Sequence, residues 1–212
     1  TAWAFATLRI SEPRLFDAIA CASEQRIGDF KPQDLSNTAW AFAKLDLRAP
    51  GLFDAIARES KQRVGSFEPQ GLANTAWAFA TLGISEPRLF DAIACASEQR
   101  IGDFKPQDLS NTAWAFAKLD LRAPGLFDAI ARESKQRVGS FEPQGLANTA
   151  WAFAVVDVAR RDALVDAVSA RASEIGGTTF SRQKRSQLHQ FFLSVELEAC
   201  LPTELPIGLR DA

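Results

Sequence analysis

Tryptophan and asparagine recur at fixed positions of this sequence, and both side chains can recognise the bases of RNA. An indole ring can stack on a base, and an amide can hydrogen-bond to a base edge. The two sets are Trp3, Trp40, Trp77, Trp114 and Trp151, and Asn37, Asn74, Asn111 and Asn148. Each set also has a structural interpretation. Tryptophan can pack in the core, which we favour. Asparagine can bond the backbone from unit to unit, and we leave this open beside base contact.

One further position changes while its surroundings stay constant. It is occupied by Thr7, Lys44, Thr81, Lys118 and Val155. Lysine can donate a hydrogen bond to guanine O6 or N7, or to a phosphate, whereas threonine is neutral and less selective. If each unit reads about one base, the preferred RNA would alternate as X-Y-X-Y. The alternative interpretation is ordinary variation on a solvated surface.

No group of residues in the sequence is typical of an enzyme or a metal site. His189 is the only histidine, and Cys21, Cys95 and Cys200 form no CxxC or Cys/His cluster. The sequence contains no paired-carboxylate motif, no nucleophile triad and no phosphate-binding loop. We therefore expect no catalysis, no metal and no cofactor.

Composition and charge narrow the class of protein further. The chain has 212 residues, with 24 Lys and Arg against 26 Asp and Glu, and 47% of its residues are hydrophobic. This composition predicts a folded chain and argues against strong non-specific binding to nucleic acid. The longest charge-free run, residues 69–85, is too short and too polar to span a membrane. Because the chain contains no methionine, we interpret it as a fragment or a processed form.

An internal repeat determines the predicted architecture. The string Thr-Ala-Trp-Ala-Phe-Ala begins at Thr1, Thr38, Thr75, Thr112 and Thr149, a spacing of 37 residues. The first half of the repeat region, residues 1–74, differs from residues 75–148 only by Arg9 in place of Gly83. The duplication is therefore either very recent or engineered. A fixed period of this length is typical of a solenoid of helical hairpins.

Each unit is expected to contain two helices. The first is predicted over Pro32 to Leu45 and the second over Pro50 to Val64, with Gly65 as the helix stop. The predicted fold is therefore an all-α solenoid of stacked helical hairpins over residues 1–155. Its units are 1–37, 38–74, 75–111 and 112–148, followed by a fifth that begins at 149.

The C-terminal part, residues 156–212, is predicted to hold degenerate capping helices and a tail. Gly176 and Gly177 are expected to end the first capping helix. A second is expected over Ser186 to Glu198, with an apolar side that includes Leu188 and Phe191. Terminal repeats need a different outer face, which is the role we assign to these helices.

A helical wheel of the first helix leaves one narrow polar stripe. The stripe contains Gln33, Asn37 and Lys44, with Asp34 and Ala41 at its edge. Trp40 is placed outside the stripe and against a neighbouring helix. We expect the first helices to line the concave face of the solenoid. The RNA-binding candidates on this stripe are Gln33, Asn37, Lys44, Gln70, Asn74, Thr81, Gln107, Asn111, Lys118, Gln144 and Asn148.

The run Pro-Gln-Asp-Leu-Ser-Asn-Thr-Ala-Trp-Ala-Phe-Ala-Lys-Leu resembles the octotricopeptide repeat of algal and dinoflagellate-type proteins, and the resemblance covers about residues 1–155. The segment from Ser186 to Leu209 is similar to the one that often precedes a RAP domain. The resemblance implies a modular protein of mitochondrial or plastid gene expression that binds single-stranded or ribosomal RNA. Such proteins tend to be more basic, and here only Arg182, Lys184 and Arg185 cluster.

Two functions therefore stay open at the level of sequence. The first is sequence-specific RNA binding, which the resemblance and the polar stripe favour. The second is a protein–protein scaffold, for example a structural subunit of an organellar ribosome, which the neutral charge favours. Solenoids serve both functions, so the fold alone does not choose between them.

Overall fold

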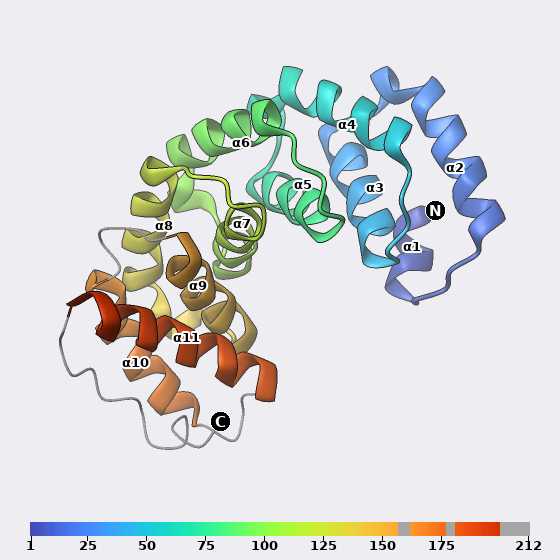
Figure 1. The fold of residues 1–212 in the computed structure, drawn as a ribbon. Helices are drawn as coiled ribbons and strands as arrows, with labels where there is room; N and C mark the ends of the chain where they lie inside the picture. The colour runs from blue at the N-terminus through green and yellow to red at the C-terminus, as the bar shows by residue number, and fades with distance from the viewer. Residues whose placement is uncertain (157–161, 177–180, 200–212) are drawn as a thin grey trace. The chain divides into compact units, whose positions relative to one another are not determined.

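A computed structural model describes residues 1–156, 162–176 and 181–199 of the chain, and these residues form α-helices and short 3₁₀ turns without any strand (Figure 1). The predicted all-α solenoid of helical hairpins is confirmed. The helices are α1 Ala2–Thr7, α2 Pro13–Gln25, α3 Pro32–Lys44, α4 Pro50–Gln62, α5 Pro69–Thr81, α6 Pro87–Gln99, α7 Pro106–Lys118, α8 Pro124–Gln136, α9 Pro143–Val156, α10 Asp162–Ile175 and α11 Arg182–Ala199. The predicted tail, Cys200 included, lies outside the described residues.

Proline begins every helix from α2 to α9, as the sequence predicts. The first helical position needs no N–H donor, and the fixed φ of proline suits the helix. The predicted role of Gly65 as a helix stop is wrong. The α4 helix ends at Gln62, and Gly65 lies within a 3₁₀ turn, Val64–Ser66. Gly176, by contrast, follows the end of α10 with a φ of +81°, as expected of a C-terminal glycine.

The chain divides into two compact units, Thr1–Arg100 and Ile101–Ala212. In the first unit the helices form two layers (Figure 1). The layer of first helices contains α1, α3 and α5, and the layer of second helices contains α2, α4 and α6. Each helix packs on the corresponding helix of the next repeat, because a single hairpin cannot bury its own apolar faces.

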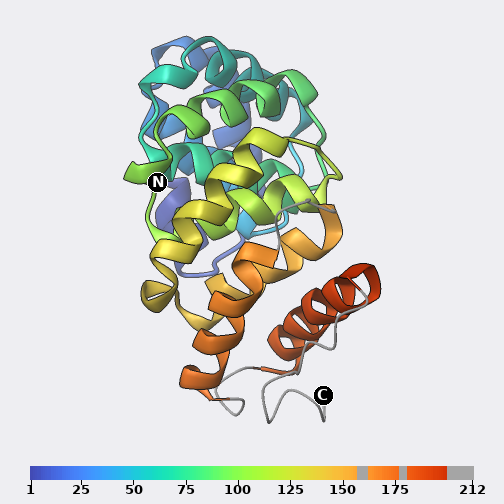
Figure 2. The same ribbon diagram turned by 90° about the vertical axis from the view of Figure 1, so that its left-hand side faces the viewer.

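In the second unit, the capping helices take over the packing partners that a further repeat would supply. Helix α7 packs on α9, α9 packs on α11, and α10 packs on both α8 and α9 (Figure 2). Helix α11 starts four residues before the predicted Ser186. Its residues Leu188 and Phe191 are fully buried, as their predicted position on the apolar side requires.

Phenylalanine supplies the largest side chains of the core. Phe53 of α4 meets Phe79 of α5 with ring centroids 5.0 Å apart, and Phe127 of α8 meets Phe153 of α9 at 5.2 Å. Both contacts are edge-to-face, and all four rings are fully buried. Edge-to-face pairs of this kind join the second helix of one repeat to the first helix of the next.

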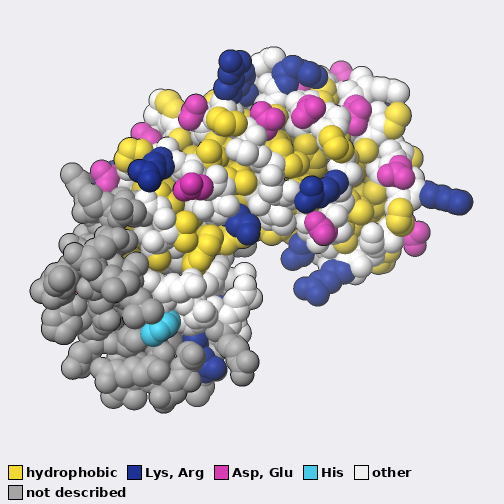
Figure 3. Space-filling view, viewed as in Figure 1, with side chains coloured by type: hydrophobic (Ala, Val, Ile, Leu, Met, Phe, Trp, Pro, Cys, Tyr) yellow, Lys and Arg dark blue, Asp and Glu magenta, His cyan; other side chains and the backbone are white. Residues whose placement is uncertain are grey.

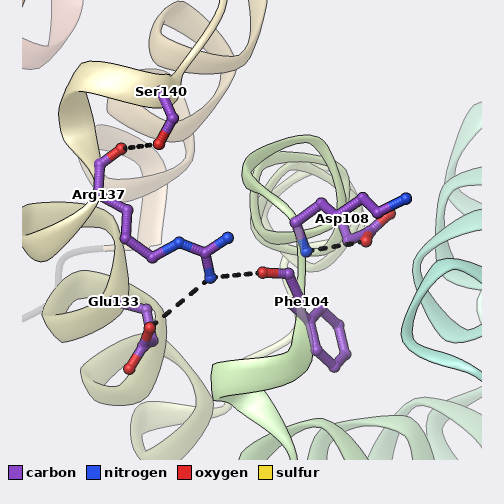
Figure 4. Close-up of polar contacts among 6 residues, drawn as sticks. Phe104, Asp108, Glu133, Arg137 and Ser140 are labelled. Atoms are coloured by element: carbon purple, nitrogen blue, oxygen red, sulfur yellow. Dashed lines mark hydrogen bonds and ion pairs between the residues drawn. The ribbon is translucent and has the colours of Figure 1, made fainter.

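An arginine after the second helix links neighbouring repeats. Arg137 donates a hydrogen bond from Nη1 to the carbonyl oxygen of Phe104, 2.7 Å away, and lies 3.9 Å from a carboxylate oxygen of Glu133 (Figure 4). In the first unit, Arg100 makes the same bond to the carbonyl oxygen of Phe67 at 2.8 Å. Each arginine therefore satisfies a backbone acceptor of the preceding repeat, which would otherwise lack a partner.

Candidate functional site

The layer of first helices in unit 1 carries a groove of about 450 Å³ that is lined by both polar and apolar side chains. Four of the predicted RNA-binding residues meet there: Gln33 and Asn37 from α3, and Gln70 and Asn74 from α5. The remaining lining residues are Trp3, Lys31, Pro32, Ser36, Ser66, Phe67, Glu68 and Gly71. Within this unit, the structure thus brings the predicted amides of two successive helices to one surface.

The groove has a mixed polar and apolar lining and is close to neutral. Lys31 and Glu68 are its two charged residues, and the carboxylate of Glu68 lies 3.6 Å from the guanidinium of Arg100. Primary amides both donate and accept hydrogen bonds, as the edges of nucleobases do. A neutral groove lined with amides suits a base edge better than a phosphate.

These two charged residues of the groove, Lys31 and Glu68, are not among the candidates predicted from the sequence. The sequence does contain a signal for them. Each first helix starts at a proline, and the residue before that proline alternates in charge along the repeats: Lys31, Glu68, Lys105, Glu142. In unit 1 this alternation places a cation before α3 and an anion before α5.

The predicted burial of the tryptophans in the core is wrong. Trp40 and Trp77 are half-buried, with ring centroids 6.5 Å apart and planes tilted by 35°, and Trp114 and Trp151 form the same pair in unit 2. Trp40 follows Asn37 by three residues, so it shares the face of the polar stripe. Ala41, expected at the edge of that stripe, is fully buried instead. Helices that pack this closely admit alanine between them but exclude an indole.

The variable position lies beside the tryptophans and outside the groove lining. In α3 the ammonium of Lys44 lies 5.9 Å from the centroid of the Trp40 ring, within the range of a cation–π contact. In α1 the hydroxyl of Thr7 donates to the carbonyl oxygen of Trp3 at 2.8 Å. Lys44 and Lys118 are both exposed, whereas Thr81 is half-buried. A lysine at this position thus places a cation beside the tryptophan ring four residues earlier, whereas Thr7 bonds only the backbone of Trp3.

In unit 2 the candidate amides occupy the same repeat positions. Gln107 and Gln144 are exposed, and Asn111 and Asn148 are half-buried. The amide oxygen of Asn148 accepts a hydrogen bond from Nε2 of Gln187 in α11 at 3.5 Å. One member of the asparagine set thus bonds from one helix to the next, through a side chain rather than the backbone.

The charged side chains outside the groove are of both signs. Lys and Arg side chains are interspersed with Asp and Glu over the face shown in Figure 3. Arg58 and Arg132 are exposed, as expected of solvated charges, and so are Cys21 and Cys95. Across the described residues, no group of three or more His, Cys, Asp or Glu could hold a metal ion, and no helix is long and apolar enough to cross a membrane.

Comparison with known proteins gives one family. The family described as RNA-editing substrate-binding complex 6 protein (RESC6) matches residues 1–191, a span that includes all five repeats and α10. A search of curated proteins found no match to the chain.

Proposed function

Because this chain belongs to the family of RNA-editing substrate-binding complex 6 proteins, we propose that it binds single-stranded RNA through the exposed face of its first helices. The observation that carries the proposal is the groove in unit 1, where Gln33, Asn37, Gln70 and Asn74 converge beside Trp3. Amides and aromatic rings are the groups that proteins use to read and stack unpaired bases. The role is binding and not catalysis.

The charge of the chain sets the expected character of this binding. With a formal net charge of −2, few phosphates can be neutralised, so base contacts supply a larger share of the affinity than in basic RNA-binding proteins. We expect weak overall affinity that depends little on salt and more on sequence. The resemblance to octotricopeptide repeats supports a role in the mitochondrion or plastid, within a complex that holds both RNA and protein.

A protein–protein scaffold is the second candidate function, and the balanced charge of the surface favours it (Figure 3). In this alternative the chain holds neighbouring subunits of a large assembly, such as an organellar ribosome or an RNA-editing complex. Charged residues of both signs suit a polar protein interface as well as solvent.

Selection from a pool of randomised single-stranded RNA, performed with the whole chain at low salt, tests the RNA proposal. We expect an enriched motif, and a labelled oligonucleotide carrying it should bind in a fluorescence anisotropy titration. An unenriched pool, together with no measurable binding at low salt, would reject RNA binding and leave the scaffold.

A double variant in which threonine replaces both Lys44 and Lys118 separates two roles for the variable position, phosphate contact and base selection. Lys44 does not line the groove, so we expect the double variant to bind all sequences somewhat more weakly, with a shallower salt dependence, as for lost phosphate contacts. Lys61 and Lys135, two exposed lysines of the second helices, give the matched control when changed to threonine. A loss confined to an alternating guanine motif would instead assign base selection to the two lysines.

A further inference from the structure

Helix α11 packs on α9 as α9 packs on α7, so it takes the place of the first helix of a further repeat (Figure 2). In the repeats, the polar stripe of a first helix carries glutamine and asparagine amides. Helix α11 carries an amide at the same junction, because Nε2 of Gln187 donates to the amide oxygen of Asn148 in α9 at 3.5 Å. The amide surface of unit 2 thus continues from α9 onto α11.

Two cations lie next to this amide pair on α11. Lys184 precedes Gln187 by three residues, so the two side chains lie on one face of the helix. Lys184 and Arg185 also lie one turn before Leu188, which is fully buried, and both cations are themselves half-buried. Long cationic side chains in such a position cover their aliphatic stems and keep their charged ends at the surface.

Neither cation makes an ion pair within the part of the chain that the structure describes. The nearby Arg171 of α10, by contrast, lies 3.1 Å from a carboxylate oxygen of Glu174. The Nε atom of Arg185 is buried without a hydrogen-bond partner among these residues, and so is Nδ1 of His189, one turn later. A buried donor without an acceptor lowers stability. This part of α11 therefore favours a ligand that brings oxygen acceptors and negative charge.

We propose that α11 extends the RNA-binding surface and holds the phosphate backbone of the RNA with Lys184 and Arg185, while Asn148 and Gln187 face the adjoining nucleotide. This inference rests on the proposed function and adds to it where the backbone is held. Lysine supplies a point charge, and a guanidinium group can bond two phosphate oxygens at once. Capping the solenoid requires only the apolar side of α11, so that role does not account for the two unpaired cations.

The charge of the chain makes this contact important. In the groove of unit 1, the one cation of the lining, Lys31, is offset by Glu68, and the formal net charge of the chain is −2. Each phosphate that a protein neutralises on a single strand contributes about −0.7 to the slope of log K against log salt concentration. If Lys184 and Arg185 neutralise one or two phosphates, they account for about −0.7 to −1.4 of that slope.

Three double variants of the whole chain test the inference, each titrated at several salt concentrations with the labelled single-stranded RNA from the selection. K184Q with R185Q should make the slope shallower by about 0.7–1.4. K184R with R185K keeps both charges and should retain the slope of the wild type. K61Q with K135Q removes two exposed lysines of the second helices and should retain it as well.

Circular dichroism shows whether each variant folds, and K184Q alone, with an expected change of about 0.7 in the slope, carries the test if the glutamine double variant unfolds. An unchanged slope in the folded glutamine variant would overturn the inference while leaving RNA binding in place. An equal change in K61Q with K135Q, or in the variant that keeps both charges, would also overturn it. A wild-type chain that binds no RNA at low salt would remove the proposed function and the inference together.

Discussion

At the scale of single residues, the one difference between the duplicated halves lies at a position with an unusual backbone. Arg9 has a φ of +56° and Gly83 a φ of +69°, and the same repeat position in the other units holds Asp46 and Asp120, both at +54°. Only glycine adopts this left-handed region without cost, and aspartate tolerates it better than most residues. Arg9 is therefore the strained copy.

Replacing Arg9 with glycine should stabilise the chain by about 1 kcal/mol, because the left-handed conformation costs an ordinary residue roughly 1–2 kcal/mol. The reverse change, Gly83→Arg, is the matched control and should cost a similar amount. A Cβ at Gly83 meets nothing within 4 Å, so no clash adds to the backbone term. Urea unfolding of both variants measures the two shifts, and shifts of the same sign would contradict the strain.

Two aspartates at one repeat position also differ in their surroundings. Asp108 is 6% exposed, and this burial raises its pKa above the ordinary value of 3.8, although its carboxylate accepts a hydrogen bond from the N–H of Lys105 at 3.0 Å. Asp34 accepts the same bond from Lys31 but is exposed. The folded state thus holds the proton of Asp108 more tightly than the unfolded state does.

Stability should therefore fall as the pH rises from 3.8 through the raised pKa of Asp108, because the charged form is disfavoured in the folded state. Asp108→Asn should remove this fall and should leave the chain more stable than the wild type near neutral pH. Asp34→Asn is the matched control, since both changes keep an acceptor at the start of the helix. The measurement is the free energy of unfolding of each variant minus that of the wild type across this pH range. A constant difference for Asp108→Asn would contradict the burial cost.

At the scale of elements, the first turn of α5 carries a glycine, Gly71, beside Phe67 and beside Ser36 of α3. Gly71→Leu should destabilise the chain by about 1–3 kcal/mol, because the new side chain would overlap Phe67 and Ser36. It should also separate Trp40 from Trp77, which near-ultraviolet circular dichroism would register. Gly65→Ala is the control: its Cβ meets nothing within 4 Å and its φ is not positive, so the change should be neutral or slightly stabilising.

At the scale of the whole molecule, stability depends on stacked repeats that each contact only their neighbours. Phe79 is fully buried, so Phe79→Ala should lower the free energy of unfolding by about 3–5 kcal/mol. Trp77→Ala should cost clearly less, because Trp77 is only half-buried and leaves no closed cavity when truncated. Urea unfolding compares the two. A greater loss for Trp77→Ala than for Phe79→Ala would return the tryptophans to the core.

The sequence by itself determined the repeat, the all-α class and the proline at the start of helices α2 to α9. These features follow from local rules: proline suits a first turn, and a strict 37-residue period with helical spacing permits only stacked hairpins. The four amides of the groove were also predictable, because residues at one repeat position on successive helices lie on one face.

Only the tertiary structure decided the place of the tryptophans and the form of the groove. A helical wheel gives the direction of a side chain but not how near the neighbouring helix comes. The duplicated halves make the point most clearly. Residues 1–74 and 75–148 are nearly identical, yet Trp3 is exposed where Trp77 is half-buried, and Asp34 is exposed where Asp108 is buried. Identical residues differ because the helices that pack beside them differ.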